Sequence, residues 1–137
     1  MTKQTHNPPE LFNSLQYGFS QMVSSSGGTT IHMSGQVAWD ENQNIVGAGD
    51  LAIQTQQTFK NIDTALKTIG ASINDVVSMR IYIVGEQMEN SGCVGATLRE
   101  WFSAENAPAT TWLGIHSLAQ PDFLIEIEAI AVINQMQ

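Results

Sequence analysis

The sequence predicts a single α+β domain in which two helices pack on one face of a mixed β-sheet, in the order β-β-α-β-α-β-β. The chain has 137 residues, the length of one domain. Strand-like and helix-like segments alternate along it, and each of two β-α-β crossovers places a helix against the sheet. The last segment, Phe123–Ile133, is mostly apolar on both faces, which is typical of a strand covered on both sides.

The predicted domain spans residues 1–137, of which residues 1–15 are expected to form an extended N-terminal arm. The adjacent prolines Pro8 and Pro9 favour an extended chain there. Two strand-like runs, Phe19–Val23 and Thr29–Val37, then flank a turn rich in serine and glycine. Such a pattern predicts a β-hairpin between the two runs.

The clearest element is a helix over Asp50–Ile69. Asp50 stands at the N-cap position, and Gly70 follows the last residue of the apolar stripe. The stripe recurs every three or four residues, as one face of a helix requires, through Leu51, Thr55, Phe59, Ile62, Leu66 and Ile69.

The second half of the chain predicts three strands and one helix. Residues 76–84 alternate in part between apolar and polar side chains and form a strand. A helix follows over residues 87–104, weakened in its first half by Gly92 and Gly95. Extended runs over Ala109–Ile115 and Phe123–Ile133 complete the sheet.

Charge excludes some classes of partner. Only 13% of the residues are charged, and the net charge is −8. So few charges leave neutral or apolar surface, for which a subunit interface is one use. A negative field repels phosphate backbones, and the basic residues form no patch, so we expect no nucleic-acid partner. They are scattered along the sequence at Lys3, Lys60, Lys67, Arg80 and Arg99.

The sequence predicts a cytoplasmic protein with neither a metal nor a cofactor. No apolar run approaches the roughly 20 residues that span a bilayer, and no signal peptide is expected. Cys93 is the single cysteine, and the three histidines lack ligand spacing. The glycine-rich stretches do not follow the pattern of a phosphate-binding loop.

Two acids interrupt the last strand. Glu126 and Glu128 share one of its faces, and a buried carboxylate needs a partner, a proton or a wet cleft. One interpretation pairs at least one of them with Arg80. The other places one acid in a cleft as a general acid/base or ligand acceptor.

Several segments together resemble the Rid family (YjgF/RidA, also called endoribonuclease L-PSP). They follow the family's order from about Phe19 to Val132. They are Ser34–Val37, Asp50-Leu51 with Gln54 and Gln57, Asn61-Ile62, Leu66, Gly70-Ala71, Asp75–Val77, Phe102, Pro108-Ala109 and Ile125–Ala131.

The resemblance implies a chorismate-mutase-like fold and a homotrimer with a cleft between each pair of neighbouring subunits. In the family's deaminases an arginine after the Pro-Ala pair grips the substrate carboxylate. The first glutamate of the final motif orients a water that hydrolyses an enamine or imine. Glu126 matches that catalytic glutamate, and Gly35 matches the glycine at the cleft wall.

The chain departs from the deaminase pattern at several ligand-binding positions. Thr110 replaces the arginine and is followed by Thr111 and Trp112. Phe19 takes the place of a cleft tyrosine, although Tyr17 is two residues away. Gly95 stands where the deaminases often have asparagine. Because a threonine hydroxyl cannot replace a guanidinium, we expect little activity on 2-iminopropionate and a neutral or cationic ligand instead.

Three functions follow, in order of preference. The first is a trimer whose clefts bind a small metabolite and act on it as a deaminase-type hydrolase of altered specificity. The alternative is a non-catalytic interaction or chaperone-like trimer. Ribonuclease activity is disfavoured by the negative charge. A carboxylate held in the cleft by Arg80 or Arg99 of a neighbouring subunit would restore the deaminase interpretation.

Overall fold

The computed structural model describes residues 2–134 of the chain. It contains six β-strands and two α-helices, connected in part by short 3-10 turns at residues 14–17, 73–75, 85–90 and 104–106. In chain order the elements are β1 (Thr2–His6), β2 (Met22–Ser26), β3 (Thr29–Gln36), α1 (Leu51–Lys67), β4 (Val76–Val84), α2 (Gly92–Trp101), β5 (Ala109–Ile115) and β6 (Ile125–Ile133).

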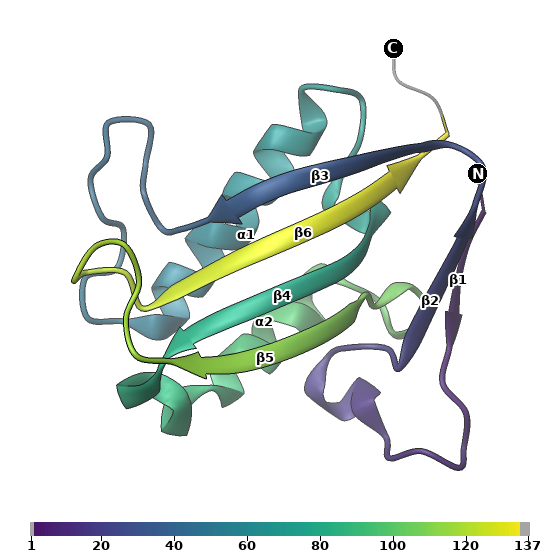
Figure 1. The fold of residues 1–137 in the computed structure, drawn as a ribbon, viewed down its shortest axis with the longest axis horizontal. Helices are drawn as coiled ribbons and strands as arrows, with labels where there is room; N and C mark the ends of the chain where they lie inside the picture. Colours follow the sequence, from purple (N-terminus) through teal and green to yellow (C-terminus); the bar gives the residue numbers. More distant parts are fainter. Residues whose placement is uncertain (1, 135–137) are drawn as a thin grey trace.

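The main sheet has four strands in the order β3-β6-β4-β5. Strands β4 and β5 run parallel, whereas β6 is antiparallel to both of its neighbours. Both helices lie on the same side of this sheet, and within residues 2–134 no α-helix covers its other face (Figure 1). The predicted α+β class, with two helices on one face of a mixed sheet, is confirmed.

The N-terminal part differs from the prediction. Strand β2 pairs with β1, whereas β3 pairs with β6, so the predicted hairpin between β2 and β3 is wrong. The residues expected to form an arm instead contain strand β1 and the start of a 3-10 turn. The reason is polarity: β2 ends in three exposed serines and offers no apolar face to the main sheet, so it pairs with the equally polar Thr2–His6.

A lysine attaches this N-terminal hairpin to the rest of the molecule. The Nζ atom of Lys3 donates hydrogen bonds to the carbonyl oxygens of Asn74, Val76 and Asn106, at 3.0, 2.8 and 2.9 Å. Burial lowers the pKa of Lys3 to about 8, although Asp75 opposes that shift. The hairpin is therefore held by a desolvated ammonium group that backbone oxygens satisfy.

Helix α1 follows its sequence signals closely. The Asp50 carboxylate accepts a hydrogen bond from the Ile53 amide at 3.0 Å, and Gly70 adopts a positive φ of 79°. Helix α2 is shorter than the predicted 87–104, because a 3-10 turn occupies residues 85–90 and the α-helix starts at Gly92. Two glycines in four residues weaken the helical preference at that end.

The core lies between the sheet and the two helices. Every second residue of β6 from Ile125 to Ile133 is buried there, as the alternation predicts. The opposite face of β6 carries Glu126, Glu128 and Ile130, which are half-buried, and ends in the buried Val132. Within one chain β6 is therefore covered on one face, whereas its sequence is apolar enough for two.

Candidate functional site

A β-bulge sets Glu126 beside Gly35. Met33 pairs with Ala129 and Gln36 with Ile127, so two residues of β3 stand opposite one residue of β6. A Cβ atom on Gly35 would lie 2.8 Å from Cγ of Glu126 and would overlap its carboxylate. The missing side chain at residue 35 thus makes the space that the Glu126 carboxylate occupies. These two predicted site residues are neighbours.

The second acid has a different partner. The hydroxyl of Tyr82 donates a hydrogen bond to Oε1 of Glu128. This bond, together with desolvation and the charge of Glu128, raises the pKa of Tyr82, against the opposing effect of Arg80. Glu128 therefore has a structural partner on β4, whereas no hydrogen bond to the Glu126 side chain is found among residues 2–134.

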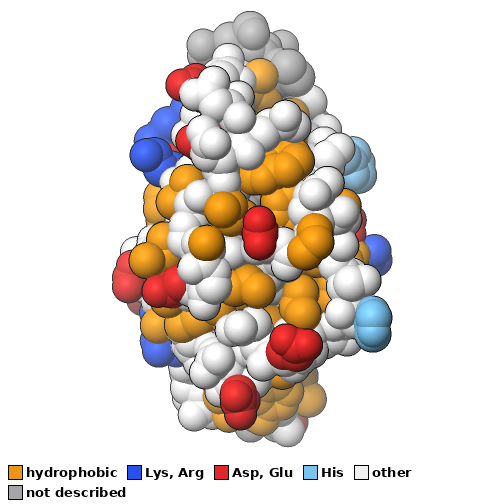
Figure 2. Space-filling model, turned by 90° about the vertical axis from the view of Figure 1, so that its left-hand side faces the viewer, with side chains coloured by type: hydrophobic (Ala, Val, Ile, Leu, Met, Phe, Trp, Pro, Cys, Tyr) orange, Lys and Arg blue, Asp and Glu red, His pale blue; other side chains and the backbone are white. Residues whose placement is uncertain are grey.

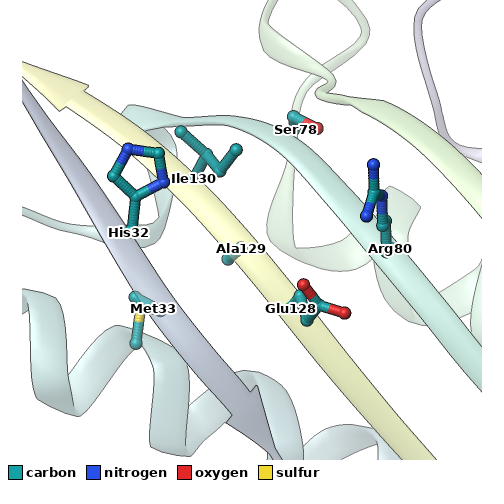
Figure 3. A pocket seen from close by; sticks show the side chains of 7 residues that line it. All are labelled: His32, Met33, Ser78, Arg80, Glu128, Ala129 and Ile130. Carbon is teal, nitrogen blue, oxygen red and sulfur yellow. The ribbon is translucent and has the colours of Figure 1, made fainter.

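Arg80 does not form the ion pair that one interpretation expected. It stands opposite Glu128 in the β4–β6 register. Among residues 2–134, however, the ion pair within 4 Å joins Lys67 and Asp63, at 2.8 Å. Figure 3 shows Arg80 and Glu128 on neighbouring strands, with His32 on the far side of β6. They line a cavity of about 320 Å³ together with Met33, Ser78, Ala129 and Ile130.

A second cavity, of about 510 Å³, collects three of the predicted ligand-binding residues, Phe19, Gly95 and Trp112. We call it the aromatic pocket. The ring centroids of Phe19 and Trp112 are 6.2 Å apart. The pocket is lined by Tyr17, Phe19, Ser91, Gly92, Gly95, Arg99 and Trp112. Because Tyr17 and Phe19 both line it, either side chain can contact a ligand there.

The two threonines point to opposite faces of the sheet. Thr110 pairs with buried Met79 and therefore lies on the helix side, where its Oγ1 accepts a hydrogen bond from Nε1 of Trp112 at 3.0 Å. Thr111 pairs with exposed Arg80 and lies on the open face. The hydroxyl at the arginine position is thus already engaged by the neighbouring indole.

Within one chain the predicted site is divided between the two faces of the sheet. Gly35, Glu126 and Thr111 belong to the open face, and we call them the acidic half-site. Phe19, Gly95, Thr110 and Trp112 belong to the helix side, in or next to the aromatic pocket. A cleft that contains both groups therefore needs more than one copy of the chain.

The sequence interpretation did not place Arg99 in the ligand pocket of its own chain. Arg99 follows Gly95 by four residues, so both lie on the same face of α2. The four-residue spacing is the sequence signal that could have placed Arg99 beside Gly95. Tyr82, the partner of Glu128, could not be found in this way, because strand register decides which tyrosine meets which acid.

Other groups that could support chemistry contribute little. Among residues 2–134, no three His, Cys, Asp or Glu side chains are placed to hold a metal ion. Burial raises the pKa of Cys93, which disfavours its thiolate. No helix of the described chain is both long and apolar enough to cross a bilayer. Figure 2 shows acidic side chains separated by hydrophobic and neutral ones, with Lys and Arg at the margins of the view.

Comparisons with known proteins match nearly the whole chain. The family model for Endoribonuclease L-PSP matches residues 13–133. A RutC family protein of Pyrococcus horikoshii is 32% identical over 113 residues, which cover 82% of this chain and 85% of that protein. A 2-iminobutanoate/2-iminopropanoate deaminase of Dermatophagoides farinae is 28% identical over 107 residues, which cover 78% of this chain and 80% of that one.

Solved structures of Rid proteins resemble this chain as well. A protein of unknown function of the conserved Rid family, YyfB from Yersinia pestis, superposes with a TM-score of 0.91 at 37% identity, covering 97% of this chain and 100% of that one. RidA of the Antarctic bacterium Psychrobacter sp. superposes with a TM-score of 0.68 at 26% identity, covering 84% of this chain and 88% of that one. The chain therefore belongs to the YjgF/RidA family.

Proposed function

We propose that the protein is a homotrimer whose inter-subunit clefts bind a small metabolite and hydrolyse an enamine or imine with altered specificity. The observation that carries the proposal is the Glu126 carboxylate, which lies in the space left by Gly35 on the open face of the sheet. A relative 28% identical to this chain is a 2-iminobutanoate/2-iminopropanoate deaminase, which supports the reaction class.

The division of the site supports the assembly. The acidic half-site and the aromatic pocket lie on opposite faces of one sheet, so one chain cannot offer both to a single ligand. A neighbouring copy packed on the open face would bring its own aromatic pocket toward Glu126. The apolar residues on the open face of β6 would be covered in the same step.

In this cleft Glu126 acts as the water-orienting base. It accepts a proton from a water molecule, whose oxygen then adds to the carbon of the C=N bond, and it passes that proton on to the nitrogen. Collapse of the resulting carbinolamine releases ammonia and leaves a carbonyl product. A carboxylate that accepts no hydrogen bond from residues 2–134 suits this task better than Glu128, which already accepts from Tyr82.

The specificity differs from that of the arginine-bearing deaminases because the Thr110 hydroxyl, which accepts from the Trp112 indole, offers one neutral donor in place of a charged guanidinium. We therefore expect the imine derived from alanine to be a poor substrate. Trp112 and Phe19 favour larger, flatter substrates instead.

The test compares two isosteric variants of neighbouring acids. Imines are generated in situ from several amino acids by an amino-acid oxidase, and ammonia release is measured. Glu126→Gln should lower the rate on the best imine by about 100-fold or more, which is the usual contribution of a general base. Glu128→Gln should stay within about threefold of the wild type, because Glu128 has no proton to take in this mechanism.

Two results would overturn the proposed function. One is an equal loss of imine hydrolysis in both variants, which would mean that the activity depends on an intact strand β6 and not on the Glu126 carboxylate itself. The other is a protein that elutes as a monomer, since the cleft would then not exist.

A second function is favoured by a separate observation. Several large hydrophobic side chains near the N-terminus are exposed, namely Leu11, Phe12, Tyr17 and Met22. Such a surface suits a non-catalytic interaction or chaperone-like role. Ser91→Trp, which fills the aromatic pocket, separates the two: suppression of client aggregation would survive it, whereas cleft chemistry would not.

A further inference from the structure

We propose that Arg99 replaces the missing β5 arginine, so that the aromatic pocket takes a carboxylate that carries a flat or bulky apolar group. This inference rests on the proposed function, because it names the ligand class of the same cleft. It reverses the expectation of a neutral or cationic ligand, which followed from Thr110 alone.

The first support is the charge of the aromatic pocket. Of the described residues, Arg99 is the one charged side chain that lines it, and no acid does. The whole chain carries −8, so a pocket whose lining is positive goes against the general field of the protein. Within residues 2–134, no carboxylate lies within 4 Å of the Arg99 guanidinium. Its charge is thus available to an anionic ligand.

The second support is the way the guanidinium is held. Nη1 of Arg99 donates a hydrogen bond to the carbonyl oxygen of Gln16, in the turn that precedes Phe19. One donor is used for positioning, and a guanidinium has five. The remaining N–H groups form a planar fork that matches a carboxylate.

The third support is the space beside Gly95. A Cβ atom on Gly95 would lie 3.5 Å from Nη1 of Arg99 and 3.5 Å from Cη2 of Trp112. The guanidinium and the indole therefore flank the same empty point. A larger residue at position 95 would fill that point and would also approach the carbonyl oxygen of Tyr17, at 2.9 Å.

The pocket accordingly combines one anion-binding group with aromatic walls. A carboxylate at Arg99 would place its attached group against the rings of Trp112 and Phe19, which are 6.2 Å apart. A cavity of about 510 Å³ holds a phenyl or branched side chain and leaves a methyl group poorly contacted. Arg99 thus determines the charge of the ligand, and the two rings determine its shape.

The experiment measures binding of phenylacetate, acetate and the neutral analogue phenylacetamide by titration calorimetry. The wild-type protein should bind phenylacetate more tightly than either of the other probes. Arg99→Met should weaken phenylacetate by about 10- to 100-fold, the usual effect of losing a charge-assisted hydrogen bond, and should leave phenylacetamide nearly unchanged. Lys60→Met, which removes one exposed positive charge on α1, is the matched control and should bind as the wild type does.

The ratio of the affinities for phenylacetate and phenylacetamide distinguishes a role of Arg99 in ligand binding from a purely structural role. If Arg99 only holds the turn at Gln16, Arg99→Met weakens both phenyl probes alike, and the inference is wrong. Should Arg99→Met fail to fold, Arg99→Lys keeps the charge and the same ratio is measured on it; a ratio unchanged by the loss of the planar fork then contradicts the role of Arg99.

Failure of this inference can be told from failure of the proposed function. If Arg99→Met leaves the acid-to-amide ratio unchanged while Glu126→Gln abolishes imine hydrolysis, the ligand class is wrong and the cleft chemistry stands. If the ratio depends on Arg99 but Glu126→Gln has no effect on turnover, the pocket binds carboxylates and the proposed reaction is wrong.

Discussion

A single missing side chain governs the acidic half-site. Gly35 has no positive φ, so its role is spatial: any Cβ atom there would overlap the Glu126 carboxylate. The bulge between Met33 and Gln36 turns that empty position toward β6. The carboxylate and the glycine therefore form one unit, and a change at either residue moves the other.

Gly35→Ala should displace the Glu126 carboxylate and reduce imine hydrolysis almost as much as Glu126→Gln does. Its effect on the free energy of unfolding should be small, about 1 kcal/mol or less, because the half-buried Glu126 side chain is flexible and can rotate away as a whole. Both quantities can be measured on one preparation, by ammonia release and by urea denaturation.

Gly85→Ala is the matched control, since a Cβ atom there meets only the Ile115 carbonyl oxygen at 3.5 Å. Full activity in Gly35→Ala would show that the position of the carboxylate does not depend on the glycine.

Among the elements, helix α1 shows how far a local signal determines structure. The Asp50 carboxylate accepts from the Ile53 amide, which is otherwise without a partner in the first turn. Asp50→Ala should lower the free energy of unfolding by about 1 kcal/mol. Asp50→Asn keeps a capping oxygen and should lose much less, as measured by urea denaturation. Equal loss in the two variants would contradict a capping role.

The N-terminal hairpin depends on a contact that titrates. The pKa of Lys3 is about 8 in the folded chain, against an ordinary value of 10.5, and desolvation is the main cause. Between these values the unfolded chain holds a proton that the folded chain has released. The contribution of Lys3 to stability should therefore increase with pH across this window, and should be constant below it.

The measurement is the difference in unfolding free energy between the wild type and Lys3→Met at several pH values. That difference should shift in favour of the wild type as the pH rises from 8 to 10.5. The same series on Lys60→Met serves as the control. A difference that stays constant over the whole range would contradict the lowered pKa of Lys3.

At the scale of the whole molecule, the open face of the sheet is the central feature. Figure 1 shows both helices on the opposite side of the sheet. Glu126 stands between the buried residues Ile125 and Ile127 on β6, so its side chain points to the open face. Trp112 and Gly95 lie on the helix side of the same sheet. An active cleft built from these residues must therefore be assembled from two subunits of the proposed trimer.

Subunit mixing tests this arrangement directly. Glu126→Gln lacks the base and Ser91→Trp blocks the aromatic pocket, so each variant alone should be inactive. After the two are unfolded together and refolded as mixed trimers, about one quarter of the clefts should combine an open pocket with an intact Glu126. Imine hydrolysis should recover in that proportion. No recovery, in trimers shown to be mixed, would mean that both groups of residues act within one subunit.

The strongest predictions from the sequence were those that depend on local periodicity. Helix α1, strand β4 and the buried face of β6 follow from the spacing of apolar residues, and the structure agrees with them. The pairing of β2 could not be predicted, because a short polar strand carries no pattern that selects between β1 and β3. Helix α2 was placed correctly but too long, since Gly92 and Gly95 weaken its start without specifying where it begins.

By itself the sequence determined the family, the α+β class and the pairing of Glu126 with Gly35, two of the three residues of the acidic half-site. Ordered motifs and short-range periodicity are properties of the chain, so they need no knowledge of distant contacts. Tertiary structure alone decided that Arg99 shares a pocket with Phe19 and Trp112. It also decided that the predicted ligand residues lie on two faces of one sheet. Strand register and helix packing bring distant residues together or apart, and no local spacing encodes them.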